Sequence, residues 1–313
     1  MLESWEQQVK VVAAGIRRRV LKYTLENNGG YLSQACSSAD LLATLYTRLM
    51  NLGPAVSPPV PLPFPGVPGP GNDAYFTGAG YNGPHEPHLD RFFFSPVHYA
   101  LVLYSTLIEA GRMAPAGLEM FNVDGSSVEL IGAEHSPGHE VTAGSLGQCI
   151  SQAAGISFAR RLNGETGCNW VFMSDGEFQE GQVWEAFAAM SYHGIDNLAV
   201  FVDANAQQCD GAMEGVMSIE PLTSRLQAFG AVVREVDGHD AGALAQAGGQ
   251  PWSGGPLVVV ARTDPCRGLE LLRERAPKLH YVRFKSDAEF TAYRQQLDRM
   301  ERDAAQPKEG TDG

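Results

Sequence analysis

Between residues 170 and 261, short apolar runs alternate with longer stretches in which apolar residues recur at helical spacing. The apolar runs, which we expect to be buried strands, cover 170–173, 198–202, 231–236 and 256–261. The stretches between them, which we expect to be helices, cover 180–193, 221–229 and 241–247. Strands that alternate with helices form parallel sheets, so this pattern predicts an α/β fold: a doubly wound, mostly parallel sheet with helices on both faces.

The rest of the sequence extends this domain in both directions. Helices are expected over 3–27, 39–50 and 145–162, and the apolar segment 92–109 is expected to become a buried helix after Ser95-Pro96. Ser286 and Glu289 have the spacing of a capping box, which predicts a last helix over 287–302 and a loose tail from Ala304. We therefore assign residues 1–285 to one domain and 286–313 to a carboxyl-terminal helix and flexible tail.

The segment 53–72 differs in composition from the rest of the chain. It contains GPAVSPPVPLPFPGVPGPG, and so much proline and glycine excludes both a helix and a hydrogen-bonded strand. It is interpreted as a stiff surface insertion. The alternative is a loop that lines the mouth of an active site or contacts another subunit.

Composition and charge limit the partners. The net charge of −13 argues against nucleic acid or an anionic membrane surface as the main partner. The five cysteines form no C-x-x-C pair, which favours reduced thiols over a disulfide or zinc framework. Glu3 and Glu6 lie where a signal peptide would be basic and then apolar, and no run approaches a membrane span, so a cytoplasmic protein is expected.

Two consecutive predicted strands end in oxygen-bearing side chains. Asp175 follows the first and Asn205 the second, about 30 residues apart, which is roughly the length of one strand–helix–strand unit. If the strands are neighbours, both side chains meet at the edge where ligands of open α/β sheets bind. Either residue alone could be a helix cap or a turn residue. Together they favour a site for Mg²⁺ or Ca²⁺ with room for phosphate oxygens, which Gly176 lets the backbone approach.

The segments SDGEFQEGQVWEA (174–186) and DNLAVFVDANAQQCDG (196–211) resemble the thiamine diphosphate motif of transketolases, which is G-D-G, a helix and then N. The resemblance runs from about residue 5 to residue 285 and includes DRFFFSPVHYALVLY, VTAGSLGQ and VDGHD. It implies thiamine diphosphate and a divalent ion, Mg²⁺ or Ca²⁺, as cofactors.

The resemblance also implies roles for individual residues. Asp175, Asn205 and the backbone carbonyl of Gln207 would hold the ion. Residues implied to contact or adjoin the cofactor are His98, Gly144, Leu146, Asp175, Gly176, Glu177, Glu180, Asn205 and His280. Of these, His98, His280 and Glu180 are the candidate catalytic residues. Glu177 is expected to be a solvated or helix-capping acid, unless its closeness to Asp175 places it behind the metal site.

The sequence departs from the family on the sugar-binding side. Depending on the alignment, Tyr31 or Asn27 stands where the family has a substrate-facing histidine, and His135 is an open candidate to replace a second one. The first glycine of the motif is Ser174. These changes put the usual substrate in question and leave the expected cofactor site intact.

The chain resembles only the amino-terminal half of the family, whose members carry the pyrimidine-binding domain and the activating glutamate in a second domain. The resemblance therefore implies one subunit of a split transketolase, active only with a separate pyrimidine-binding subunit in an α2β2 assembly. Glu180 and Glu185 match acids buried at a subunit interface. The leading function is transfer of a two-carbon ketol unit from a ketose or ketose phosphate to an aldose. Alternatives are another thiamine diphosphate carboligase or decarboxylase subunit, and a non-catalytic cofactor-binding subunit.

Overall fold

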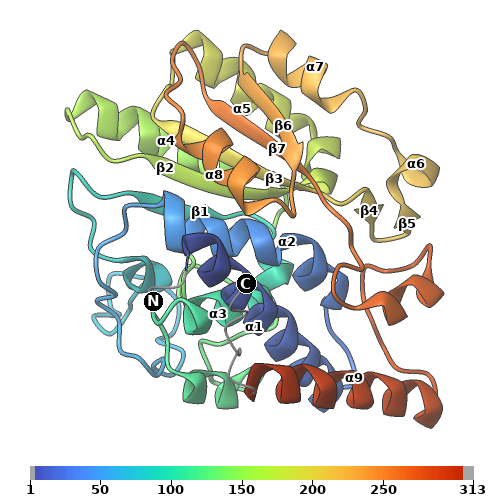
Figure 1. The fold of residues 1–313 in the computed structure, drawn as a ribbon. Coiled ribbons are helices and arrows are strands. Elements are labelled where there is room, and N and C mark those ends of the chain that lie inside the picture. The colour runs from blue at the N-terminus through green and yellow to red at the C-terminus, as the bar shows by residue number, and fades with distance from the viewer. Residues whose placement is uncertain (1–3, 306–313) are drawn as a thin grey trace.

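The computed structural model describes residues 4–305, which are built around a parallel sheet of five strands (Figure 1). The strands are β1 (Arg91–Phe94), β2 (Asn169–Ser174), β3 (Leu198–Ala204), β6 (Val232–Asp237) and β7 (Leu257–Arg262), in the spatial order β1-β2-β3-β7-β6. β2 and β3 are neighbours, with Ser174 opposite Asp203. The two strand ends predicted to carry ligands therefore lie side by side.

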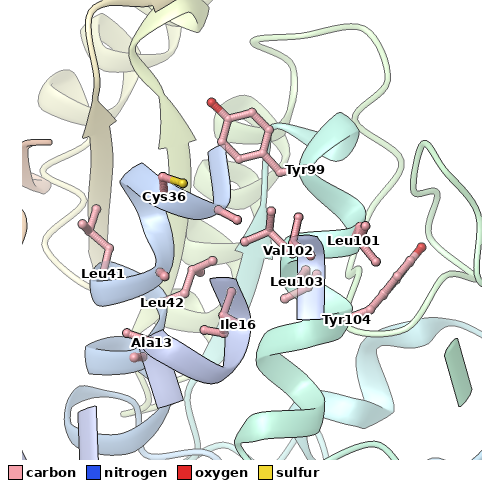
Figure 2. Close-up of a cluster of buried hydrophobic side chains, with 14 of the residues drawn as sticks. Ala13, Ile16, Cys36, Leu41, Leu42, Tyr99, Leu101, Val102, Leu103 and Tyr104 are labelled. Atoms are coloured by element: carbon pink, nitrogen blue, oxygen red, sulfur yellow. The ribbon is translucent and has the colours of Figure 1, made fainter. Parts of the chain in front are cut away.

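Helices cover both faces of the sheet, which confirms the doubly wound fold. One face carries α1 (Trp5–Glu26), α2 (Leu32–Thr44), α3 (Ala100–Glu109) and α8 (Ala241–Gly249), and the other carries α4 (Cys149–Leu162), α5 (Gly181–Tyr192) and α7 (Leu222–Ala228). Successive side chains of a strand point to opposite faces of the sheet, so they belong to two separate hydrophobic clusters. Phe172 packs with the first group of helices and Val171 with the second. Figure 2 shows part of the first cluster, where Ile16 of α1, Leu42 of α2 and Leu103 of α3 lie between the helices.

Strand β1 is not predicted from the sequence, which gives an expected helix after Ser95-Pro96 in the segment 92–109 but no strand before it. Helix α3 does form in this segment, but Arg91–Phe94 first pairs with β2 and then leads into a short 3₁₀ turn, η3 (Val97–Tyr99). A strand of four residues inside a continuous apolar run shows no alternation. Only its pairing with β2 distinguishes it from the helix that follows.

Two helix starts also differ from expectation. α2 begins at Leu32 rather than residue 39, and α4 begins at Cys149 rather than residue 145. Gly147 explains the second difference, because its φ of +81° is incompatible with a right-handed helix. α9 (Asp287–Ala305) begins as predicted: the Glu289 amide donates a hydrogen bond to the Ser286 hydroxyl. It continues through Ala305, so the expectation of a loose tail from Ala304 was wrong at 304–305, and the rest of that tail, 306–313, lies outside the described residues.

Short elements complete the description. They are η1 (Leu45–Leu49), η2 (Gly78–Asn82), η4 (Pro115–Met120), η5 (Asp175–Gln179), β4 (Gln207–Gln208), β5 (Gly211–Ala212), α6 (Met213–Val216) and η6 (Glu270–Arg275). The proline-rich segment 53–72 forms neither helix nor sheet strand, and it is held by contacts such as the hydrogen bond from the Phe64 amide to the Gly125 carbonyl, 2.9 Å. In the part of the chain described, no helix is long and apolar enough to cross a membrane.

Candidate functional site

A pocket of about 380 Å³ opens beside the carboxyl ends of β2 and β3. Its walls include most of the site residues predicted from the sequence: His98, Gly144, Leu146, Gly176, Glu180, Gln207 and His280. These residues are spread over more than half of the chain, and the topology brings them to one sheet edge. The pocket therefore brings these seven predicted residues together, while Asp175, Glu177 and Asn205 are buried and do not line it.

Asp175 lies at the base of this edge, directly after β2. Its side chain is buried, and its Oδ2 accepts a 2.7 Å hydrogen bond from the Ala206 amide. Its Oδ1 is buried and has no hydrogen-bond partner among residues 4–305. Burial, with the nearby Asp203 carboxylate as the second cause, raises the pKa of Asp175 well above its usual value. A buried carboxylate with a free oxygen is costly unless a cation neutralises it.

Asn205 lies next to it, after β3. Its Oδ1 accepts from the Gln207 amide at 2.9 Å, and its Nδ2 donates to Oδ2 of Asp203 at 3.1 Å. Asp203 is fully buried and also accepts hydrogen bonds from the hydroxyls of Ser37 and Thr263, each 2.6 Å. Asp203 is not among the residues predicted from the sequence, although a carboxylate two residues before Asn205 inside an apolar strand is a usable signal.

These groups fit a divalent cation. Within residues 4–305 no group of three or more His, Cys, Asp or Glu side chains could hold a metal by itself. The oxygens present are instead one carboxylate, one carboxamide and backbone carbonyls, a hard-oxygen set that needs ligand oxygens to complete it. The buried Oδ1 of Asp175, which no described residue contacts by a hydrogen bond, is the observation that favours a cation here.

Three aromatic rings meet at the wall of the pocket. The ring of Tyr31 lies 5.1 Å from that of His98 and 5.3 Å from that of His280, and the two imidazoles lie 5.2 Å apart. Burial, followed by the neighbouring His280, lowers the pKa of His98 to about 3. Burial also lowers the pKa of His280. Both rings are therefore neutral at pH 7.

Gln34 on α2 sets the tautomer of one of these histidines. Its Nε2 donates to Nδ1 of His280 at 3.1 Å and to the His280 carbonyl at 2.9 Å. The neutral His280 ring must then carry its proton on Nε2. Neither Gln34 nor Cys209, which also lines the pocket, is predicted from the sequence, because nothing in the local pattern marks them.

The acids after Asp175 have different environments. Glu177 is buried, so the expectation of a solvated acid was wrong, whereas the expectation of a helix cap is confirmed by its capping box with Ser174. Glu180 lines the pocket at the start of α5, and both it and Glu185 are exposed in the single chain. The burial expected for these two glutamates would require another chain.

Two candidate substrate residues lie away from the pocket. Asn27 is exposed at the end of α1, where its side chain donates to the Tyr23 carbonyl at 2.8 Å. His135 pairs with Glu129 at 3.1 Å and packs on Phe64 of the proline-rich segment. Of the three candidates, the structure brings only Tyr31 to His98 and His280.

Comparisons with known proteins agree with this geometry. A family model described as "Transketolase, thiamine diphosphate binding domain" matches residues 74–251. A transketolase family protein of Sinorhizobium fredii is 33% identical over 275 residues, covering 87% of this chain and 88% of its own. An apulose-4-phosphate transketolase subunit from Actinobacillus succinogenes is 27% identical and covers 88% of this chain and 91% of its own.

Longer relatives are matched over only part of their length. Human transketolase is 29% identical over 84% of this chain but 38% of its own. The crystal structure of transketolase from Campylobacter jejuni superposes with a TM-score of 0.70 at 20% identity, over 97% of this chain and 48% of that one. The fold and its pocket define a thiamine-diphosphate-binding α/β domain. The chain belongs to the transketolase family and corresponds to its amino-terminal part.

Proposed function

We propose that this chain is the diphosphate-binding subunit of a split transketolase, which transfers a two-carbon ketol unit from a ketose to an aldose. The observation that carries the proposal is the buried Oδ1 of Asp175, which has no partner among the described residues; Oδ2 of Asp175 accepts from Ala206, the residue after Asn205, beside the pocket at the ends of β2 and β3. Support comes from relatives of similar length whose names include "transketolase subunit", in Clostridium and in Actinobacillus succinogenes.

In this proposal Asp175, Asn205 and the carbonyl of Gln207 hold Mg²⁺, or Ca²⁺, which in turn holds the diphosphate. Gly176 lines the pocket without a side chain, and a Cβ added there would meet no atom of the described residues within 4 Å, so the backbone is open to a phosphate. Gly144, Leu146 and Glu180 form the remaining contacts to the cofactor. Thiamine diphosphate, when bound, supplies a group that stabilises a carbanion.

His98, His280 and Glu180 are proposed to be the catalytic residues of this chain. Because the two histidines are neutral at pH 7, each can accept a proton on its bare ring nitrogen and donate a hydrogen bond from the other. The hydrogen bond from Gln34 leaves the His280 proton on Nε2, where it can be donated to a substrate oxygen. Tyr31, in contact with both rings, takes the place of a third histidine and selects the substrate.

The proposed assembly is α2β2, with two copies of this chain and two pyrimidine-binding subunits. A groove of about 350 Å³ between α4 and α5 supports self-association; it is lined by Ala154, Gly155, Phe158, Ala186, Ala189 and Met190. Glu185 also lines this groove. A second copy packed there would bury the apolar lining, and this burial would stabilise the association by about 25 cal/mol per Å² of apolar surface removed from water.

Ketol transfer assays test the proposal. The full-length chain is assayed alone, and after co-expression with a chain that resembles the carboxyl-terminal half of transketolase. We expect turnover only from the pair and only with thiamine diphosphate and Mg²⁺. Turnover by the isolated chain would exclude a split enzyme. Cofactor binding without turnover in any combination would instead favour the non-catalytic alternative. Because Tyr31 replaces a substrate-facing histidine of the family, the same proteins are also assayed for carboligase and decarboxylase activity, which tests the alternative thiamine diphosphate reactions.

A further inference from the structure

Three segments that are distant in sequence form part of the wall of the proposed cofactor pocket. They are 95–98, which carries His98; 144–147, which carries Gly144 and Leu146; and 174–176, which carries Gly176. Within residues 4–305, no strand pairing joins the second segment to the other two. Something else must hold it against the end of β2.

The carboxylate of Glu177 contacts all three segments. Its Oε1 accepts a hydrogen bond from the Ser95 hydroxyl and another, of 3.3 Å, from the Gly147 amide. Its Oε2 accepts from the amide of Ser174 at 2.8 Å and from the hydroxyl of Ser174 at 3.1 Å. The side chain itself is not part of the pocket lining.

Burial and charge make these contacts specific to glutamate. Glu177 is 1% exposed, so no water can substitute for a lost contact. The two backbone amides can only donate, and each faces a different carboxylate oxygen. A carboxamide offers one acceptor oxygen, so glutamine would turn its NH₂ toward one of these amides. An aspartate is one methylene shorter and would not span from Ser174 to Gly147.

We propose that Glu177 is a positioning residue that fixes the three cofactor-lining segments relative to one another, so that cofactor affinity depends on its carboxylate and its length. This rests on the proposed cofactor site, because the affinity concerned is that for thiamine diphosphate. Glu177 holds Gly147 in place, and with it the neighbouring Leu146 and Gly144. It likewise holds Ser95 at the start of the turn that presents His98.

The test uses the full-length chain, with thiamine diphosphate and Mg²⁺ as probe, in isothermal titration calorimetry of Glu177→Gln, Glu177→Asp and Glu177→Ala. We expect the dissociation constant to rise about 10- to 100-fold, the range typical when a residue that supports a ligand is removed. The dissociation constant should be lowest for wild type, higher for Glu177→Gln and highest for Glu177→Ala, because glutamine can still accept a hydrogen bond from Ser174 and donate one to Ser95. Hydrogen exchange of the peptide covering 142–148 should accelerate in the same order.

Glu140→Gln is the matched control. Glu140 is also buried, and its carboxylate pairs with Arg91 and His85, neither of which lines the pocket. This variant should lose thermal stability but keep its cofactor affinity, which separates positioning from general destabilisation. Unchanged affinity and unchanged exchange in Glu177→Gln would overturn the inference. If the wild-type chain binds no cofactor, either alone or together with a pyrimidine-binding subunit, the proposed function fails, and exchange of 142–148 still decides whether Glu177 holds that segment.

Discussion

The carboxylate of Asp175 and the amide of Ala206 are joined by a 2.7 Å hydrogen bond that ties the end of β2 to the end of β3. Ala206 has a φ of +56°, which is uncommon for a residue with a side chain. The bond uses one carboxylate oxygen and leaves the other buried, without a partner in the described part of the chain. This edge of the sheet is therefore arranged at some cost in stability, as is typical of functional sites.

Replacing Asp175 separates binding from stability. Asp175→Asn should abolish Mg²⁺-dependent binding of thiamine diphosphate, because it removes the anionic ligand. Without Mg²⁺ the same variant should be more stable than wild type, by about 1–3 kcal/mol, since an unpaired buried charge is lost. Calorimetry measures the first effect and urea denaturation the second. Asp175→Ala should also lose binding, and retained cofactor affinity in either variant would contradict the assignment.

Changing Tyr31 should alter substrate choice. We expect weak wild-type activity on xylulose 5-phosphate plus ribose 5-phosphate, and higher activity from Tyr31→His, because an imidazole can both accept and donate a proton near pH 7, whereas burial raises the pKa of the Tyr31 phenol above its usual value. Steady-state kinetics of the complete enzyme measure kcat/KM. Asn27→His is the control, since Asn27 lies outside the pocket and its replacement should change nothing. Full wild-type activity on this sugar pair would show that the replacement of histidine is neutral.

Acid should destabilise the chain through His139. Burial lowers the pKa of His139 to about 4, and its ring packs against Phe94 and Tyr104. Because the folded state keeps this ring neutral, unfolding takes up a proton below about pH 6.5, and stability falls as the pH drops from there to about 4. Between pH 7 and pH 5 the loss due to this group should be about 2 kcal/mol.

Denaturation curves of His139→Gln at both pH values check this effect. The variant should be less stable at pH 7 but should lose less stability on acidification, because it lacks the buried ring that must take up a proton on unfolding. His98 and His280, whose pKa values are also lowered, add a dependence of the same sign in both proteins. His88→Gln, at an exposed histidine, is the control and should behave like wild type. An unchanged pH dependence in His139→Gln would refute the prediction.

The groove between α4 and α5 should be needed for self-association. Ala189 is exposed and lines the groove, so Ala189→Arg places a long cation where a second copy would pack. Light scattering should show a shift to smaller species. Circular dichroism should show that the variant keeps its fold. Val67→Arg, at a residue that is 74% exposed on the proline-rich segment, should leave the assembly intact. A wild-type chain that is monomeric in the active complex would exclude the proposed α2β2 arrangement.

The sequence alone predicted the order of most elements, and it predicted that Asp175 and Asn205 meet at one edge if their strands are neighbours. Hydrophobic periodicity is local, so it predicts strands such as 198–202 and helices such as 241–247 to within a few residues. The rule that parallel strands present ligands at their carboxyl ends then places both side chains at one edge. The resemblance to transketolases added the residues of the pocket wall, from His98 to His280.

Tertiary structure decided which segments pair, which side chains meet and which acids are buried, because the local sequence pattern does not contain this information. Strand β1 exists because it pairs with β2, Tyr31 rather than Asn27 reaches the histidines, and Glu177 is buried rather than solvated. The role of Gln34 became visible only through its partner His280, 246 residues away, and that of Asp203 was established by Ser37, 166 residues away. Burial and hydrogen bonding between distant segments set these outcomes, since the free energy of a polar group depends on what surrounds it in space rather than on its neighbours along the chain.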